Sequence, residues 1–254
     1  MTRYVLVTGA AGGIGRATVE YLQSTGVQVL GVDLHDASIC CDLADPNARE
    51  ALVQKVQSRI PQLDAVVAAA GVLHSDPATV VAVNYFGATR LLESLRPLLA
   101  KSPSARALVL SSTSSRYPCD EDVIAACLSD DETEAIRLVK ASTKNSYAAT
   151  KAALARWVRR RAVAPEWGGS GILLNAMAPG MIVDTGMTRP LLDKPGGAER
   201  LQELTPSALG RFGTPDDMAR LIGFLSGADN RYIAGQVIYA DGGCDALQRG
   251  DAVW

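Results

Sequence analysis

Residues 7–15 read VTGAAGGIG, and this stretch decides the fold. It ends a short apolar run, Tyr4–Thr8, and opens a segment with helical periodicity. Gly9, Gly13 and Gly15 allow the tight turn and the close backbone approach that join a strand to the helix packed on it. A strand, a glycine-rich turn and a helix form the first unit of a parallel α/β sheet.

The rest of the chain repeats this alternation of short β-forming runs with longer helical segments. The runs VVAAA at 66–70 and ALVL at 107–110 are apolar on successive residues, as expected for strands covered on both faces. We therefore predict one α/β domain over 1–254, a Rossmann-like, doubly wound parallel sheet of about seven strands. The expected strands are Tyr4–Thr8, Gln28–Asp33, a short third strand before Asp42, Asp64–Ala69, Ala107–Ser111, Ile172–Ala176 and Gln236–Tyr239.

One connection is longer than this pattern requires. The segment Pro118–Asn145 contains the acidic stretch DEDVIAACLSDDETEA at 120–135 and separates the fifth strand from the next helix. We predict that it forms a helical insertion in the domain.

Composition limits the classes of function. The 254 residues are 48% hydrophobic and 20% charged, which is typical of a globular protein. The net charge of −2 gives no field for nucleic acid, and we assign the run Arg159–Arg161 to a solvated helix face. Five cysteines without C-x-x-C spacing, beside two histidines, argue against a disulfide framework and a metal site. With no long apolar segment near Met1, we expect a cytoplasmic protein that does not enter membranes.

The glycine turn predicts a dinucleotide site. The N–H groups at a helix N-terminus favour a pyrophosphate, and Asp33 ends the second strand, where an acid can accept both ribose hydroxyls. A carboxylate there would repel a 2′-phosphate, and neither lysine nor arginine lies between Gly9 and Gly15 or directly after Asp33. We therefore expect NAD rather than NADP. Asp42 is a candidate partner for the adenine amine, with a helix cap before Pro46 as the alternative.

Tyr147 and Lys151, in YAATK, lie one helical turn apart and project from one face of the helix after the insertion. A free tyrosine has a pKa of about 10, which a nearby ammonium and a positive nicotinamide ring would lower toward the working range of a base. Alone, such a pair is common on exposed helix faces. Ser112 supplies the context, because the carboxyl ends of parallel strands border the ligand site. Ser111 competes with it, since alternation lets only one of the two face the cleft.

Together these motifs resemble the classical short-chain dehydrogenase/reductase family across essentially the whole chain. The matching motifs are TGAAGGIG, VNYFG at 83–87, Ser112, YAATK, NAMAPGMIVDT at 175–185 and the late DGG at 241–243. Extended relatives such as sugar epimerases differ in the glycine spacing and in the C-terminal region. The resemblance implies that Tyr147 is the acid/base, Lys151 lowers its pKa and binds the nicotinamide ribose, and Ser112 orients the substrate oxygen. Asn84 would hold a water in a proton relay to the lysine.

The resemblance also implies a set of cofactor contacts. Besides Tyr147 and Lys151, the expected residues are Gly9, Gly13, Ile14, Gly15, Asp33, Asp42, Leu43, Ala70, Gly71, Pro179, Gly180, Ile182 and Thr185. The sequence departs from the family in two places. Ala68–Gly71 replaces a usual pair of asparagines, and the insertion separates Ser112 from Tyr147 by an unusually long interval.

That interval, VNYFGATRLL and the ending DGGCDALQRG resemble a subgroup that includes bacterial 3α-hydroxysteroid dehydrogenase/carbonyl reductases. The expected reaction is hydride transfer between nicotinamide and a secondary alcohol or ketone of an apolar, cyclic substrate such as a steroid or terpenoid. The candidate substrate residues are Ser114, Met181, Met187 and Leu191, with Val183 and Leu192 in the same apolar stretch. Packing of this stretch against the core is an equally good interpretation.

Two other functions remain open. One is an NADPH-dependent reductase of a small carbonyl compound or an acyl thioester, which Asp33 disfavours. The other is a non-catalytic nucleotide-sensing protein, which need not keep Asn84, Ser112, Tyr147 and Lys151 together. A hydrolase is disfavoured because no G-x-S-x-G elbow occurs. The family further implies a homodimer or homotetramer. We expect the insertion to obstruct the helix-mediated interface and leave a dimer.

Overall fold

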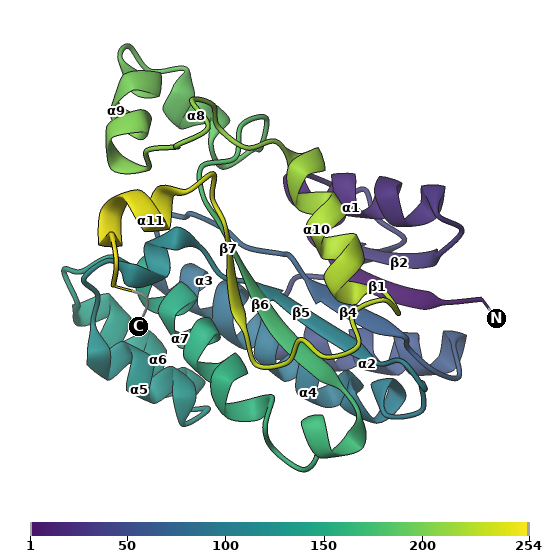
Figure 1. Cartoon of the computed structure of the whole chain (residues 1–254). Coiled ribbons are helices and arrows are strands. Elements are labelled where there is room, and N and C mark those ends of the chain that lie inside the picture. Colours follow the sequence, from purple (N-terminus) through teal and green to yellow (C-terminus); the bar gives the residue numbers. More distant parts are fainter. Residues whose placement is uncertain (1, 253–254) are drawn as a thin grey trace.

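The computed structural model describes residues 2–252. Seven parallel strands form one sheet, as the sequence predicts, and their order is β3-β2-β1-β4-β5-β6-β7 (Figure 1). The order reverses direction after β1, which is the point where such sheets form a ligand crevice. The strands are β1 Tyr4–Thr8, β2 Gln28–Asp33, β3 Ile39–Cys40, β4 Ala65–Ala68, β5 Arg106–Leu110, β6 Leu173–Pro179 and β7 Val237–Ala240.

Helices cover both faces of this sheet (Figure 1). α1 (Gly13–Ser24) and α10 (Pro215–Ser226) pack on one face, and α2 (Pro46–Arg59), α4 (Gly87–Leu99) and α7 (Ser146–Arg161) on the other. Side chains of β1 alternate between the two faces of the sheet. Val5 and Val7 pack in the core under α1 and α10, and Leu6 packs in the core under α2, α4 and α7. The remaining helices are α3 Pro77–Val81, α5 Glu121–Leu128, α6 Glu132–Ala141, α8 Arg189–Leu192, α9 Gly197–Leu204 and α11 Cys244–Arg249, with short turns at Ala82–Phe86, Thr113–Arg116 and Gly168–Ser170.

The boundary of β6 differs most from the sequence prediction. The predicted strand ended at Ala176, whereas β6 continues to Pro179. Its last residues pair with β7, Ala178 with Tyr239 and Pro179 with Ala240. This pairing partner lies some sixty residues later in the chain, so the local pattern could not reveal where β6 ends.

The insertion is helical, as predicted, and two of its acidic residues cap its helices. Asp120 caps α5 by accepting from the Asp122 amide, and Asp131 caps α6 by accepting from the Glu134 amide. Carboxylates at helix N-termini satisfy free N–H groups and interact favourably with the helix dipole. The Ser142 hydroxyl also donates to Asp120 at 2.7 Å, which joins the two ends of the insertion.

No helix among residues 2–252 is both long enough and apolar enough to cross a membrane. The five cysteines all carry free thiols.

Candidate active site

A cleft of about 530 Å³ lies at the carboxyl ends of the central strands, where the strand order reverses. Nearly all of the predicted cofactor and catalytic residues line it together. They are Gly9, Gly13, Ile14, Gly15, Asp33, Asp42, Leu43, Ala70, Gly71, Ser112, Tyr147, Lys151, Pro179, Gly180, Ile182 and Thr185. Residues from seven separate parts of the sequence therefore meet in one cavity.

The glycine turn has the geometry that a phosphate cradle requires. Gly9 and Gly13 have positive φ values of 71° and 49°, which favour glycine. A Cβ atom on Gly15 would collide with the Gly9 carbonyl oxygen, so only glycine fits this close approach. No side chain caps the N-terminus of α1 at Gly12, which leaves its backbone N–H groups for a ligand. The turn fits a dinucleotide pyrophosphate.

Asp33 is fixed beside this turn. One carboxylate oxygen accepts from the Ala11 amide at 2.9 Å and the other from the Leu34 amide at 2.7 Å. These bonds hold the carboxylate at the end of β2, where it borders the cleft. A carboxylate has further lone pairs, so both oxygens can still accept from ribose hydroxyls.

The sequence left two roles open for Asp42, a contact to the adenine amine or a helix cap, and the structure gives the cap to Asp45. Asp45 is the N-cap of α2, because it accepts from the Asn47 amide at 2.8 Å. Asp42 is exposed, lines the cleft and accepts from the Ala44 amide at 2.8 Å. The alternative of a helix cap at Asp42 is therefore wrong, and its side chain remains on the nucleotide side.

The expected catalytic residues Ser112, Tyr147 and Lys151 line the cleft where the end of β5 meets α7. The Ser112 and Tyr147 side chains both line the cleft, and their interaction acts to lower the pKa of Tyr147. Lys151 is 3% exposed, its Nζ donates to the Leu110 carbonyl at 2.7 Å, and it lies 5.4 Å from the centroid of the Tyr147 ring. Ser111 donates instead to the Lys151 carbonyl at 2.8 Å and helps to fix α7 against β5. Ser112 rather than Ser111 thus meets the tyrosine.

Burial controls the acidities here. It raises the pKa of Tyr147, and the Ser112 hydrogen bond acts in the opposite direction. Burial also lowers the pKa of Lys151 to about 8, so the ammonium still predominates at neutral pH. The lowered tyrosine pKa expected from the sequence is not a property of these side chains alone, because burial outweighs the other influences on Tyr147.

Asn84 lies next to this group, in the turn Ala82–Phe86 with its wider helical hydrogen bonding. Its side chain is 0% exposed and pairs twice with Val72, donating to the carbonyl at 3.0 Å and accepting from the amide at 2.7 Å. A Cβ atom on Gly71 would lie 3.3 Å from Lys151 Nζ and 3.5 Å from Asn84 Oδ1. Asn84 therefore orders the loop after β4 beside the lysine.

The loop after β6 closes the other side of the cleft. Gly180 packs so closely on Asp241 that an added Cβ atom would lie 2.8 Å from the Asp241 Cα. Thr188 donates to the Ile182 carbonyl at 2.7 Å, and its hydroxyl is 2.8 Å from that of Thr185. These bonds give the loop a defined path along the cleft.

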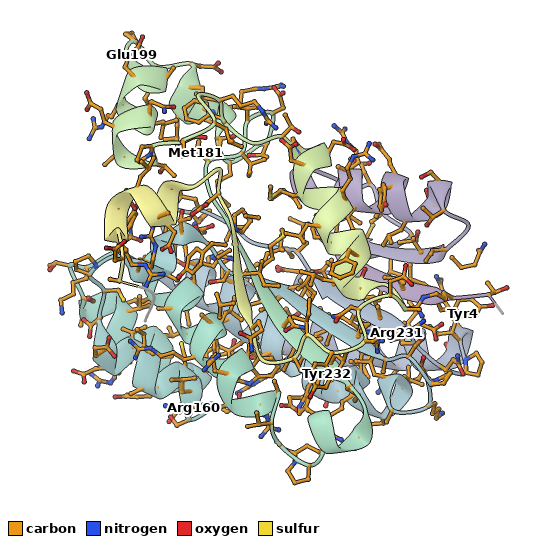
Figure 2. The ribbon with its side chains drawn as sticks, viewed as in Figure 1. Tyr4, Arg160, Met181, Glu199, Arg231 and Tyr232 are labelled. Carbon is orange, nitrogen blue, oxygen red and sulfur yellow. The ribbon has the colours of Figure 1, made fainter. Side chains whose placement is uncertain are left out.

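Three of the four candidate substrate residues do not line this cleft. Met187 does, whereas Met181 lines a smaller cavity of about 290 Å³ that shares Ile182 with it. Figure 2 places Met181 at the neck below α8 and α9. Ser114 and Leu191 line neither cavity, nor do Val183 and Leu192. The expectation of a wall built from this whole stretch is wrong, because, of the apolar residues that the prediction named in it, only Met187 lines the larger cleft.

The cleft is also lined by residues that the sequence did not point to. Leu34 directly follows Asp33 at the end of β2, a position that borders the ligand crevice, so a signal for it was available. Leu73, His74 and Val83 lie further along the chain after β4, and the local pattern gave no signal for them. Leu73, Val83 and Met187 thus add apolar surface to the cleft.

Comparison with known proteins agrees with this geometry. Residues 3–124 match the family described as short chain dehydrogenase, and residues 133–245 match the one described as Enoyl-(Acyl carrier protein) reductase. A 3-alpha-hydroxysteroid dehydrogenase/carbonyl reductase of Comamonas testosteroni is 34% identical, over 96% of this chain and 97% of the relative. A tropinone reductase homolog of Arabidopsis thaliana is 31% identical, over 94% and 91%.

Among solved structures, the 3-alpha-hydroxysteroid dehydrogenase from Pseudomonas sp. B-0831, complexed with NADH, superimposes with a TM-score of 0.91. It is 35% identical in sequence, and the match covers 98% of this chain and 99% of that one. The similarity thus spans the sheet, the insertion and the cleft. This chain belongs to the short-chain dehydrogenase/reductase family, whose members are oxidoreductases.

Proposed function

We propose that this protein is an NAD-dependent dehydrogenase that interconverts a secondary alcohol and a ketone. The observation that carries the proposal is that Ser112 and Tyr147 line the same cleft and interact through their side chains, with the Lys151 ammonium 5.4 Å from the centroid of the Tyr147 ring. A donor pair aimed at one point in a mostly buried site can hold an alcohol or carbonyl oxygen and stabilise negative charge on it.

NAD, when bound, would supply the hydride acceptor for alcohol oxidation at its nicotinamide ring. The glycine turn and α1 would hold the pyrophosphate, Asp33 the adenine ribose, Asp42 the adenine amine, and Ile182 and Thr185 the nicotinamide side. Tyr147 would take the hydroxyl proton as the ketone forms and return it in the reverse direction. Ser112 would fix the substrate oxygen, and Lys151 would bind the nicotinamide ribose and stabilise the phenolate. Asn84 would hold the water that reaches the lysine.

The preference for NAD rests on Asp33. Its carboxylate borders the cleft, and among the described residues no arginine lines the same cavity to accept a 2′-phosphate. The structural relative from Pseudomonas was solved with NADH. Asp33→Asn should therefore raise the activity with NADP relative to that with NAD by about tenfold or more, since a bond to a charged group is lost and a repulsion removed. Asp36→Asn, at an exposed position, is the matched control. An unchanged ratio in Asp33→Asn would refute this assignment.

We further propose an apolar cyclic substrate, of hydroxysteroid or terpenoid type. Leu73, Val83 and Met187 give the cleft apolar surface, and relatives that match over nearly the whole chain are named as 3α-hydroxysteroid dehydrogenases. The test is purified protein with NAD or NADP against steroids, monoterpene alcohols and small cyclic alcohols, followed by nicotinamide absorbance. Turnover confined to small carbonyl compounds with NADPH would replace this proposal, and no turnover at all would favour a nucleotide-binding protein.

Finally, we propose that the protein is a dimer formed through β7. The family's other common interface uses the helices after the fourth and fifth strands, and here the insertion lies against that side of the molecule (Figure 1).

A further inference from the structure

The segment that holds α8 and α9, residues 189–204, projects beyond the carboxyl edge of the sheet, and Figure 2 places Glu199 at its outer tip (Figures 1 and 2). It directly follows Thr185–Thr188, which line the cleft. Within residues 2–252, the hydrogen bonds that join α9 to the body of the molecule both end on one atom, the Leu204 carbonyl oxygen. This contact therefore helps to fix the far end of the segment relative to the body of the molecule.

Two side chains donate to the Leu204 oxygen. Tyr117 Oη lies 3.1 Å away and Gln248 Nε2 lies 3.0 Å away. Leu204 is the last residue of α9, and the last carbonyl groups of a helix have no partner inside it. The two donors satisfy this carbonyl from outside, one from the segment after β5 and one from α11.

The orientation of the Gln248 amide is set by Arg116. Arg116 donates to Gln248 Oε1 at 2.7 Å, and arginine can only donate, so the amide nitrogen must face Leu204. Arg116 is itself well held. It pairs with Asp245 at 3.1 Å, lies over the Tyr239 ring at 5.5 Å and has a side chain that is 14% exposed. Gln248 therefore presents its amide nitrogen to the end of α9 from a fixed position.

Arg116 and Tyr117 belong to the same short segment as Ser112. Ser112 begins the turn that contains Arg116, and its Oγ accepts from the Ser114 amide at 3.1 Å. The Tyr117 amide donates to the Ser114 carbonyl at 3.0 Å. Tyr117, which donates to α9, and Arg116, which orients Gln248, thus belong to the short segment that begins at Ser112.

We propose that Gln248 is a positioning residue that holds the α8–α9 segment over the substrate end of the cleft. Through this contact it sets the affinity for bulky apolar substrates and leaves the chemical step unaffected. Arg116 orients Gln248, and Tyr117 donates a second hydrogen bond to the same Leu204 carbonyl. The statement about substrates rests on the proposed function, whereas the statement about the position of the segment does not.

The decisive variant is Gln248→Glu. A glutamate keeps the bond to Arg116 and so keeps α11 in place, but it sets a carboxylate oxygen against the Leu204 oxygen, where no hydrogen bond can form. Tyr117→Phe removes the second donor and keeps the ring. Arg249→Ala is the matched control, because Arg249 binds Asp245 on α11 and makes no hydrogen bond to Leu204.

Trypsin reports the position of the segment without any substrate. Arg189 and Lys194 precede prolines, where trypsin cuts poorly, so Arg200 is its accessible cleavage site in the segment. With saturating NAD, Gln248→Glu should be cut at Arg200 about three to ten times faster than the wild type, as expected for loss of one hydrogen bond. The double variant with Tyr117→Phe should be cut faster still. An unchanged rate in Gln248→Glu, or an equal increase in Arg249→Ala, would overturn the proposal.

Steady-state kinetics test the statement about affinity for bulky apolar substrates. For a 3α-hydroxysteroid, Gln248→Glu should raise KM about three- to tenfold with kcat within about twofold, while KM for cyclohexanol stays the same. A fall in kcat with unchanged KM would contradict a positioning role. If the wild type does not oxidise steroids but trypsin still separates the variants as described, the proposed substrate class fails and the role of Gln248 in holding the segment stands.

Discussion

The buried ammonium of Lys151 lowers the stability of the fold at the position where the proposed reaction needs its charge. The side chain is almost fully buried, and burial lowers its pKa to about 8 from an ordinary value near 10.5. At neutral pH the folded protein must therefore keep a charge in a site that disfavours it, where the ammonium donates to the Leu110 carbonyl. Such a cost is expected where the charge is needed for function.

We predict that Lys151→Met abolishes turnover and stabilises the fold. A depression of this size corresponds to about 3 kcal/mol, and loss of the bond to Leu110 offsets about 1 kcal/mol. At pH 7 the free energy of unfolding should rise by about 2 kcal/mol. Between pH 8 and 10.5 the unfolded wild type binds more protons than the folded one, so wild-type stability rises with pH and the gain shrinks. Urea unfolding at pH 7 and pH 10 measures both, and a less stable variant at pH 7 would contradict the argument.

Tyr147 carries the proton transfer in the proposed reaction. Tyr147→Phe keeps the ring against Lys151 but removes the hydroxyl that bonds Ser112. We expect kcat to fall by about 10²–10⁴-fold, the usual contribution of a general acid or base, with NAD affinity little changed. The measurements are nicotinamide absorbance for turnover and fluorescence titration for binding. Tyr232→Phe, at a side chain that is 98% exposed, should behave as the wild type. Turnover retained in Tyr147→Phe would refute the mechanism.

Single residues also mark the limit of prediction from sequence. Ser112, Tyr147 and Lys151 could be placed together, because strand ends of a parallel sheet converge and a helical turn separates the latter two. Met181 could not be placed. It belongs to a short extended stretch that pairs with Gly213, and such a stretch alternates sides without indicating which residue faces the cleft.

At the scale of elements, the insertion shows how an added helix pair is fixed to an existing fold. Glu132, at the start of α6, accepts from Arg49 of α2 at 2.8 Å and from Arg90 of α4 at 2.9 Å. The Arg49 and Glu132 side chains are 5% and 12% exposed, so water screens this pair little. The sequence predicted a helical insertion from its local pattern. Its partners on α2 and α4 lie too far away in the chain for that pattern to reveal them.

Glu132→Ala should lower the free energy of unfolding by about 3 kcal/mol, because it leaves the buried Arg49 charge without a partner. Glu134→Ala is the matched control on the same helix. Glu134 pairs with Arg137, but the two side chains are 40% and 64% exposed, and such pairs contribute about 0–1 kcal/mol. Chemical denaturation of both variants compares them directly. Equal effects would show that the Arg49–Glu132 pair does not anchor the insertion.

At the scale of the whole molecule, the sheet has one edge at β7 that is open to a partner. In the described chain, β7 pairs with β6, whose Ala176 amide donates to the Gln236 carbonyl and whose following Gly180 amide donates to the Ala240 carbonyl. Backbone groups two residues apart point the same way, so those of Val237 and Tyr239 point outward. Exposed edges of this kind favour pairing with another chain.

Val237→Pro tests whether this edge forms the proposed dimer. Proline removes an outward N–H group and leaves the ladder to β6 intact, which is the position in an edge strand where proline is tolerated. Light scattering should give a dimer for the wild type and a monomer for Val237→Pro, with circular dichroism unchanged. Ile238→Pro, whose N–H faces β6, should unfold the sheet edge and serves as the contrast. A wild-type tetramer would show that the insertion does not block the helix-mediated interface, and a dimeric Val237→Pro would show that the chains associate through another surface.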